Sequence, residues 1–238
     1  MHFVQAKGIL SSKNGMNLYR GCTHGCIYCD SRSECYQIKH MFEDIEIKEN
    51  AIELLENTLR RKRNKCMIGT GSMSDPYMPL EEKIGMTRKA IENVYRYGFG
   101  FTVITKSPLV LRDLELLRAV NKKAKCVVQM TLTTYNDSLC KILEPNVAVT
   151  SERFAVLKKL RDAGIPTVVW LTPILPFIND TIENIEGILQ YCIEAKVFGI
   201  ICFGMGLTLR DGSREYFYKN LDSVFPGLKE KYIQRYGN

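Results

Sequence analysis

Short apolar runs recur along the chain, and stretches with helical spacing separate most of them. The apolar runs are MNLY (16–19), CMIGTG (66–71), FTVITK (101–106), CVVQMTLTT (126–134), TVVWLTP (167–173) and GIICFG (199–204). Apolar positions recur with helical spacing in residues 45–63, 87–98, 111–123, 150–164 and 181–195. Short, almost wholly apolar strands that alternate with helices predict βαβ units around a parallel sheet buried on both faces. This pattern fits either an open doubly wound sheet or a partial barrel.

The chain of 238 residues shows no change of composition, low-complexity tract or short repeat that would mark a linker. A chain of this length can bury a sizeable core, so we expect a single domain. Residues 1–204 would form the core of this domain. Residues 205–238 would form a C-terminal extension, in which apolar residues recur with helical spacing.

Composition and charge narrow the compartment and the classes of partner. No stretch approaches the roughly 18 consecutive apolar residues that a membrane-spanning helix needs, and the first residues lack the layout of a signal peptide. We therefore expect a cytoplasmic protein with no membrane partner. Thiols stay reduced there, so clustered cysteines indicate metal or redox chemistry. The net charge of +7 weakly favours a phosphate-bearing partner.

Three of the nine cysteines lie within eight residues, in CTHGCIYC (22–29), directly after the first predicted strand. In such folds ligands bind at the carboxyl ends of the strands, where polar segments such as GSMSDP (71–76) also converge. A structural zinc site takes four ligands, and one closed by Cys35, His24 or a distant thiol remains an alternative. A 4Fe–4S cluster normally takes four thiolates, so three would leave one iron open to an exogenous ligand.

The order of the motifs resembles the radical S-adenosylmethionine (radical SAM) superfamily, and within it the spore photoproduct lyase-like branch. The resemblance covers roughly residues 16–180. It is carried, in chain order, by NLYRGCTHGCIYCD, GSMSDPYMPLE, ITKS, LEPNVAVTSERFAVLKKLRDAGI and TPILPFIND. It implies an α/β fold, a partial TIM barrel of about six parallel β/α units, with the C-terminal extension covering the open side.

The resemblance also implies two cofactors, a 4Fe–4S cluster and S-adenosylmethionine. Cys22, Cys26 and Cys29 would bind three irons, and the methionine group of S-adenosylmethionine would chelate the fourth. The positions that match the family's cofactor-binding motifs are Tyr28, Ser72, Ser74, Asp75, Lys106, Thr131, Thr133, Glu144 and Arg153.

Within this set the resemblance implies particular roles. Tyr28 would lie against the adenine, Lys106 would pair with the methionine carboxylate, and the GSMSD segment (71–75) would receive the methionine amino group. The two threonines would meet the ribose, and Glu144 with Arg153 would order the cosubstrate or its loop. Taken alone, the same residues are typical of a solvated lysine, a turn cap, and a helix-capping carboxylate beside a surface cation.

The implied activity is one-electron reduction of bound S-adenosylmethionine by a flavodoxin- or ferredoxin-like donor. It would yield a 5′-deoxyadenosyl radical that abstracts hydrogen from a substrate. We expect a nucleic-acid base or nucleotide as substrate, because of the branch resemblance, the charge and the tyrosine-rich tail. A peptide or partner protein is the alternative substrate, and a zinc-stabilised binding protein is the non-enzymatic alternative.

Two details refine this expectation. Photoproduct lyase activity itself is not expected, because Ser72 and Met73 stand where that enzyme has a hydrogen-donating cysteine. The segment after the last strand should face the cosubstrate or the substrate with Met205, Gly206 and Arg210. The planar guanidinium of Arg210 makes it a candidate for binding a phosphate or carboxylate of the substrate.

Overall fold

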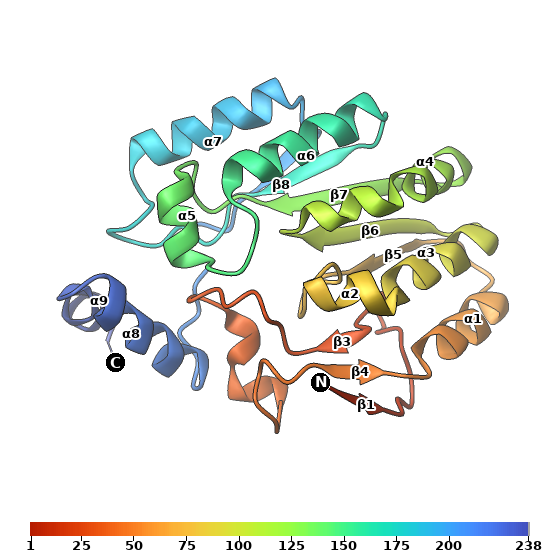
Figure 1. Ribbon diagram of the computed structural model, residues 1–238, viewed down its shortest axis with the longest axis horizontal. Helices are drawn as coiled ribbons and strands as arrows, with labels where there is room; N and C mark the ends of the chain where they lie inside the picture. The colour runs from red at the N-terminus through yellow and green to blue at the C-terminus, as the bar shows by residue number, and fades with distance from the viewer. Residues whose placement is uncertain (238) are drawn as a thin grey trace.

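The computed structural model describes residues 1–237, and its centre is a six-stranded parallel sheet (Figure 1). The strand order is β2-β5-β6-β7-β8-β9. The strands are Gly15–Met16 (β2), Met67–Thr70 (β5), Gly100–Thr105 (β6), Cys126–Thr131 (β7), Thr167–Trp170 (β8) and Gly199–Ile201 (β9). Across the sheet these six strands follow one another in the same order as along the chain. This is the strand order of a barrel rather than of a doubly wound sheet. The predicted six-stranded parallel sheet and partial barrel are confirmed, but the first predicted strand, residues 16–19, is wrong in its extent: only Met16 belongs to this sheet, and Tyr19 begins Tyr19–Arg20 (β3) of a second, three-stranded sheet.

Helices follow the strands, and Figure 1 shows α1, α3, α4, α6 and α7 one after another around the sheet. Their bounds are Ala51–Arg61 (α1), Pro79–Ile84 (α2), Met86–Arg96 (α3), Leu114–Lys123 (α4), Asp137–Leu143 (α5), Thr150–Asp162 (α6) and Ile182–Glu194 (α7). A 3₁₀ turn, Pro108–Asp113 (η3), leads into α4. The core lies between helices and sheet, where Phe101, Val103, Val128 and Met130 are fully buried.

The helix predicted over residues 45–63 is wrong in its first third, because α1 begins only at Ala51. Residues Glu46–Lys48 instead form β4, which pairs in parallel with His2–Val4 (β1) and antiparallel with Tyr19–Arg20 (β3). Ile45 and Ile47 are buried while their neighbours are only partly covered. This alternation has the period of a strand, and it is the signal that the helical interpretation missed.

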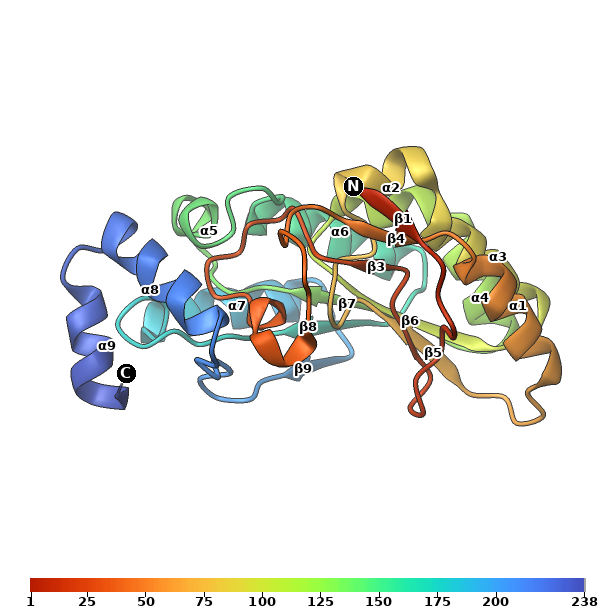
Figure 2. The ribbon, with the colours of Figure 1, turned by 90° about the horizontal axis from the view of Figure 1, so that it is seen from below.

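The C-terminal extension forms two helices, Ser213–Val224 (α8) and Leu228–Tyr236 (α9). Figure 2 shows them at the end of the molecule opposite α1. Phe217 and Tyr232 are fully buried in a hydrophobic cluster that includes Tyr28 of the cysteine loop. The segment before α8 crosses to the two short 3₁₀ turns, Asp30–Arg32 (η1) and Glu34–Tyr36 (η2), where the Glu34 N–H donates to the Asp211 carbonyl at 3.0 Å. The extension therefore bridges β9 and the N-terminal segments at the carboxyl-end rim of the sheet.

Within residues 1–237, no helix has both the length and the apolar character that crossing a membrane requires.

Candidate active site

A cavity of about 310 Å³ lies at the carboxyl ends of strands β5 to β8. Its wall includes the three clustered cysteines together with Lys106 and Thr131. Thr131 ends β7, and Lys106 directly follows the last residue of β6. Parallel strands bring their carboxyl ends to one edge of the sheet. This is why residues more than 100 positions apart line one cavity.

Two glycines shape the cysteine loop. Gly21 has a φ of +84°, and a Cβ added there would lie 2.3 Å from the Phe42 carbonyl oxygen. That carbonyl accepts a hydrogen bond of 3.0 Å from the Cys22 N–H. Gly25 has a φ of +70°, and its Cβ would lie 3.1 Å from Nδ2 of Asn146. A side chain at either position would force the loop away from the segments that hold it.

The three cysteines fit a bound iron–sulfur cluster better than a single zinc ion. Burial, with a smaller contribution from the Asp75 charge, raises the pKa of Cys22 to about 11, and burial raises that of Cys26 still further. Thiolates at such positions need a bound cationic centre to be stable. Within residues 1–237, the Sγ atoms of these three cysteines do not all lie within 4.8 Å of one another. Tetrahedral zinc, with Zn–S bonds of about 2.3 Å, would hold its sulfurs only about 3.8 Å apart.

Glu144, directly after α5, is the charged centre behind the cavity wall. Its Oε2 accepts from Arg153 at 2.5 Å, and its Oε1 accepts from the Tyr28 hydroxyl and, at 3.0 Å, from Thr133. The Lys106 ammonium lies 4.0 Å from Oε1. Burial opposes ionisation, but the Arg153 and Lys106 cations and the Tyr28 hydroxyl outweigh it and lower the pKa of Glu144 to about 2. The carboxylate is therefore ionised at neutral pH.

Asp75 joins the ends of two neighbouring strands. Its Oδ1 accepts from the Thr105 hydroxyl at 2.7 Å and from the Tyr77 N–H at 2.9 Å, and its Oδ2 accepts from the Lys106 N–H at 2.7 Å. Nδ1 of the buried His24 lies 3.5 Å from Oδ2. The carboxylate thereby fixes the backbone from which the Lys106 side chain extends.

Lys106 keeps its charge although it is largely covered. Its side chain is 20% exposed, and its ammonium lies 5.8 Å from the centre of the Tyr28 ring. Burial opposes protonation, but Cys26 and Glu144 hold the pKa of Lys106 above its ordinary value. A permanently charged amine on a cavity wall is suited to bind a carboxylate.

The structure brings most of the predicted site residues together. The cavity is lined by Cys22, Cys26, Cys29, Tyr28, Ser72, Ser74, Asp75, Lys106 and Thr131 from the predicted set. Glu144, Arg153 and Thr133 lie behind this wall and contact Tyr28 directly or through Glu144. The buried Ser74 hydroxyl donates to the Tyr19 carbonyl at 3.3 Å.

The predicted segment after the last strand contributes less of the wall than expected. Gly206 lines the cavity, whereas Met205 and Arg210 are not part of the lining. Arg210 is 48% exposed, and its Nη1 lies 3.5 Å from Oδ2 of Asp30 and 3.2 Å from the Tyr36 hydroxyl. Asp30 and Tyr36 both line the cavity. Arg210 therefore lies outside the cavity and contacts two residues of its wall.

Sequence reasoning missed two aromatic residues of the wall, Trp170 and Tyr36. Trp170 is the single tryptophan of the chain and the last residue of β8, and this position at a strand end was a usable signal. His24 also lines the cavity, and its sequence context indicates only a candidate zinc ligand. Cys35 is exposed and does not belong to the lining.

Comparison with known proteins decides the family. The family model described as "Radical SAM superfamily" matches residues 16–192 of this chain. The chain belongs to the radical SAM superfamily. It is therefore a radical SAM enzyme, as the cysteine spacing and the order of the motifs predict.

Several relatives extend over most of this radical SAM chain. An uncharacterized protein of Methanocaldococcus jannaschii is 32% identical over 210 residues, which cover 87% of this chain and 75% of that protein. An uncharacterized protein of Mycobacterium tuberculosis is 27% identical over 234 residues, and the chain spans 66% of its length. The radical SAM Nα-GlyT isomerase of Pseudomonas phage M6 is 24% identical over 168 residues, which cover 69% of this chain and 34% of that protein.

Among solved structures, a mutant spore photoproduct lyase with bound S-adenosylmethionine and dinucleoside spore photoproduct superimposes with a TM-score of 0.64. The sequences are 14% identical, and the match covers 88% of this chain and 60% of the lyase. At this identity the likeness establishes a shared fold.

Proposed function

We propose that this radical SAM enzyme binds a 4Fe–4S cluster through Cys22, Cys26 and Cys29 and acts on a nucleic-acid base or nucleotide. The observation that carries the cofactor part is the convergence of the three cysteines, the Lys106 ammonium and the Thr131 hydroxyl on one cavity. When bound, the cluster supplies the electron that divides S-adenosylmethionine into methionine and a 5′-deoxyadenosyl radical. A flavodoxin- or ferredoxin-like protein would deliver that electron.

The residues of the wall bind and orient the cosubstrate. Lys106 binds the methionine carboxylate, and Ser72 receives the methionine amino group. Tyr28 lies against the adenine with its hydroxyl held by Glu144, and Thr131 donates to the ribose. Tyr28 and the Lys106 backbone already have buried hydrogen-bond partners, so less freedom is lost when the cosubstrate binds.

Two aromatic side chains on the cavity wall support a nucleobase as substrate. The Trp170 indole donates to Gln129 at 2.5 Å and contacts the Phe203 ring at a centroid distance of 5.5 Å. Its plane is therefore fixed beside the cavity, and the Tyr36 ring lines the cavity as well. A base stacked on such a side chain gains about 1–3 kcal/mol. The dinucleoside photoproduct in the similar lyase structure also supports this substrate class.

An anaerobic assay of 5′-deoxyadenosine formation tests the substrate class. Thymine-containing oligonucleotides and nucleosides are expected to raise the rate above the uncoupled rate with S-adenosylmethionine alone. Stimulation by peptides and not by any nucleic acid would overturn the substrate proposal in favour of peptide modification.

The cofactor proposal has its own test. Cys26→Ala should lose the iron and the cleavage of S-adenosylmethionine, whereas Cys35→Ala should keep both, because Cys35 is exposed outside the cavity. Iron content and brown absorption near 400 nm report the first property, and 5′-deoxyadenosine reports the second. Retained cleavage in Cys26→Ala, or loss of iron in Cys35→Ala, would contradict the assignment of the ligands.

A further inference from the structure

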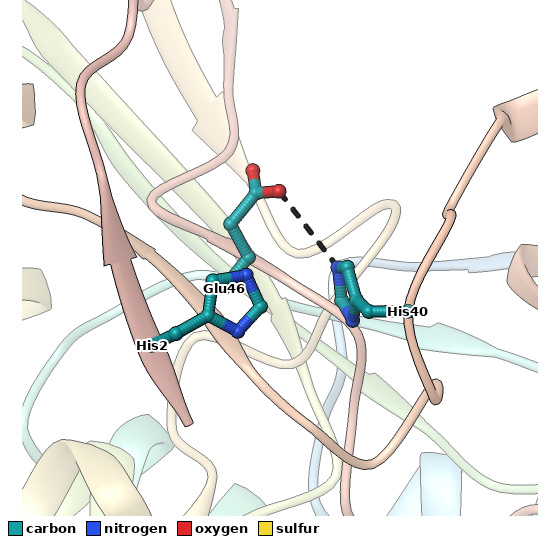
Figure 3. A group of neighbouring side chains, drawn as sticks. All are labelled: His2, His40 and Glu46. Atoms are coloured by element: carbon teal, nitrogen blue, oxygen red, sulfur yellow. Dashed lines mark ion pairs between the residues drawn. The ribbon is translucent and has the colours of Figure 1, made fainter.

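Three potential metal ligands meet on the three-stranded sheet, outside the cavity of the cysteines. One ring nitrogen of His2, one of His40 and a carboxylate oxygen of Glu46 all lie within 4.8 Å of one another. Figure 3 shows His2 on a strand and His40 on a loop, with Glu46 between them. The register of β1 and β4 places His2 directly opposite Glu46. Two of the chain's three histidines therefore converge on one carboxylate.

Hydrogen bonds leave Nε2 of both rings with a free lone pair. Nδ1 of His2 lies 3.0 Å from Oδ2 of Asp44, and Nδ1 of His40 lies 2.9 Å from the Met41 carbonyl oxygen. Both oxygens only accept, so in each neutral ring Nδ1 carries the proton and Nε2 carries none. A carboxylate or carbonyl that accepts from one nitrogen is the usual support of a histidine whose other nitrogen binds a metal.

His40 Nε2 is buried, and no side chain or backbone group of residues 1–237 makes a hydrogen bond to it. It faces Oε2 of Glu46 at 3.7 Å, which is too long for a hydrogen bond. A lone pair and a carboxylate oxygen that face each other repel, and a metal cation bound between the two atoms would turn this repulsion into two attractive contacts. Two metal–ligand bonds of about 2.1 Å each span this separation at an open angle.

Two cationic side chains near Glu46 do not fill this position. Lys48 donates to the Asn17 carbonyl at 2.8 Å, and Arg20 donates to the Tyr36 carbonyl at 2.5 Å. Each cation is therefore held by a backbone oxygen of its own.

We propose that His2, His40 and Glu46 bind one divalent transition ion, with Asp44 orienting the His2 ring. Two imidazoles and one carboxylate, with a fourth position left for water, form a donor set that suits Zn²⁺. The ion joins β1, β4 and the loop between η2 and β4.

The place of this loop gives the ion a consequence for the cysteine site. The loop carries the Phe42 carbonyl, which accepts from the Cys22 N–H at 3.0 Å. An ion on His40, two residues before Phe42, thus steadies the segment on which the cysteine loop rests.

Calorimetric titration with ZnCl₂ tests the proposal on the full-length protein that carries its cluster under anaerobic conditions. The loaded cluster occupies the clustered cysteines, so the histidine site should appear as one equivalent of bound zinc. His2→Gln and His40→Gln should each weaken this binding at least a hundredfold. Asp44→Asn keeps all three ligands and should weaken it about ten- to a hundredfold.

Glu49→Gln is the matched control, because this carboxylate lies just past β4 and accepts from Gln5 at 2.8 Å, outside the site. It should bind zinc as the wild type does. Equal zinc affinity of the wild type and a His2→Gln/His40→Gln double variant overturns the proposal, and so does the lack of a one-equivalent event in the wild type. If a histidine variant fails to fold by circular dichroism, Asp44→Asn decides, and unchanged affinity there refutes the site. If zinc bound to vacant cysteines, its affinity would be the same in all of these variants. Failure of the cluster assignment is therefore recognised separately.

Discussion

Replacing Glu144 with glutamine tests whether one buried carboxylate holds the cosubstrate cavity together. Glutamine keeps the shape but leaves the fully buried Arg153 guanidinium without its counter-ion. Removal of one partner from a buried ion pair costs roughly 3–5 kcal/mol. Burial raises the pKa of Glu144, but Arg153 and its other partners lower it from 4.5 to about 2, which corresponds to roughly 3 kcal/mol of preference for the ionised form. The two routes agree, so we expect Glu144→Gln to lose about 3 kcal/mol of stability at pH 7.

Thermal unfolding of the cluster-free chain in reducing buffer measures this loss. For a chain of this length about 3 kcal/mol lowers Tm by roughly 6–12 °C. Glu92→Gln is the matched control, because its exposed pair with Arg88, at 3.4 Å, contributes at most about 1 kcal/mol. The Glu144→Gln/Arg153→Met double variant should lose less than the sum of the single variants, since no buried charge remains. A Tm shift below about 2 °C for Glu144→Gln, or strict additivity in the double variant, would refute the reasoning.

The lowered pKa of Glu144 also predicts how the stability of the folded chain depends on pH. The pKa of Glu144 is lower in the folded state, so its contribution is fully present above the ordinary value of 4.5 and is lost as the pH falls toward about 2. The stability difference between wild type and Glu144→Gln should therefore shrink across this window in urea titrations at stepwise lower pH. A difference that stays constant down to pH 2 would mean that Glu144 is not the group that ionises.

Three further changes test other parts of the site. Lys106→Ala should weaken S-adenosylmethionine binding about ten- to a hundredfold in equilibrium dialysis with iron content unchanged, and unaltered binding would make Lys106 a surface lysine. Gly71→Ala should cost roughly 2 kcal/mol or more in urea unfolding, because its φ is +101° and the new Cβ would lie 2.0 Å from the Ile104 carbonyl oxygen. Gly69→Ala, whose Cβ meets nothing closer than 3.4 Å, is the control, and equal losses would contradict the argument. Trp170→Ala should reduce nucleic-acid-stimulated turnover about tenfold without changing uncoupled cleavage, and equal loss of both rates would assign Trp170 to cosubstrate binding.

The main strands were predictable because a parallel sheet buried on both faces needs runs of apolar residues. The run FTVITK (101–106), for example, predicted β6, which spans Gly100–Thr105 and has four of its six residues buried. The strand β4 was not predictable, because a three-residue strand with one buried position, Ile47, is too short to show a period of its own. Its charged neighbours Glu46 and Lys48 also suit an exposed helix face, so the adjoining helix absorbed it.

The site was predictable only as far as its residues are close in sequence or match a known motif. The spacing of Cys22, Cys26 and Cys29 carries its own chemical meaning. The His2, His40 and Glu46 group has no such spacing, because strand pairing creates it from segments about 40 residues apart. Long-range contacts of this kind depend on register, which local patterns leave open.

The contacts of Glu144 explain why a carboxylate and a guanidinium are both needed behind the cavity. Arg153 occupies Oε2, and the hydroxyls of Tyr28 and Thr133 occupy Oε1. Lys106 therefore stays 4.0 Å from Glu144, outside hydrogen-bond distance, although the two charges are opposite. Without Arg153 the unpaired carboxylate would draw the Lys106 ammonium toward itself and compete with the carboxylate of a cosubstrate. The buried arginine thus leaves the Lys106 ammonium free for a ligand, while Cys26 and Glu144 outweigh burial and the opposing Arg153 charge and hold the pKa of Lys106 above its ordinary value.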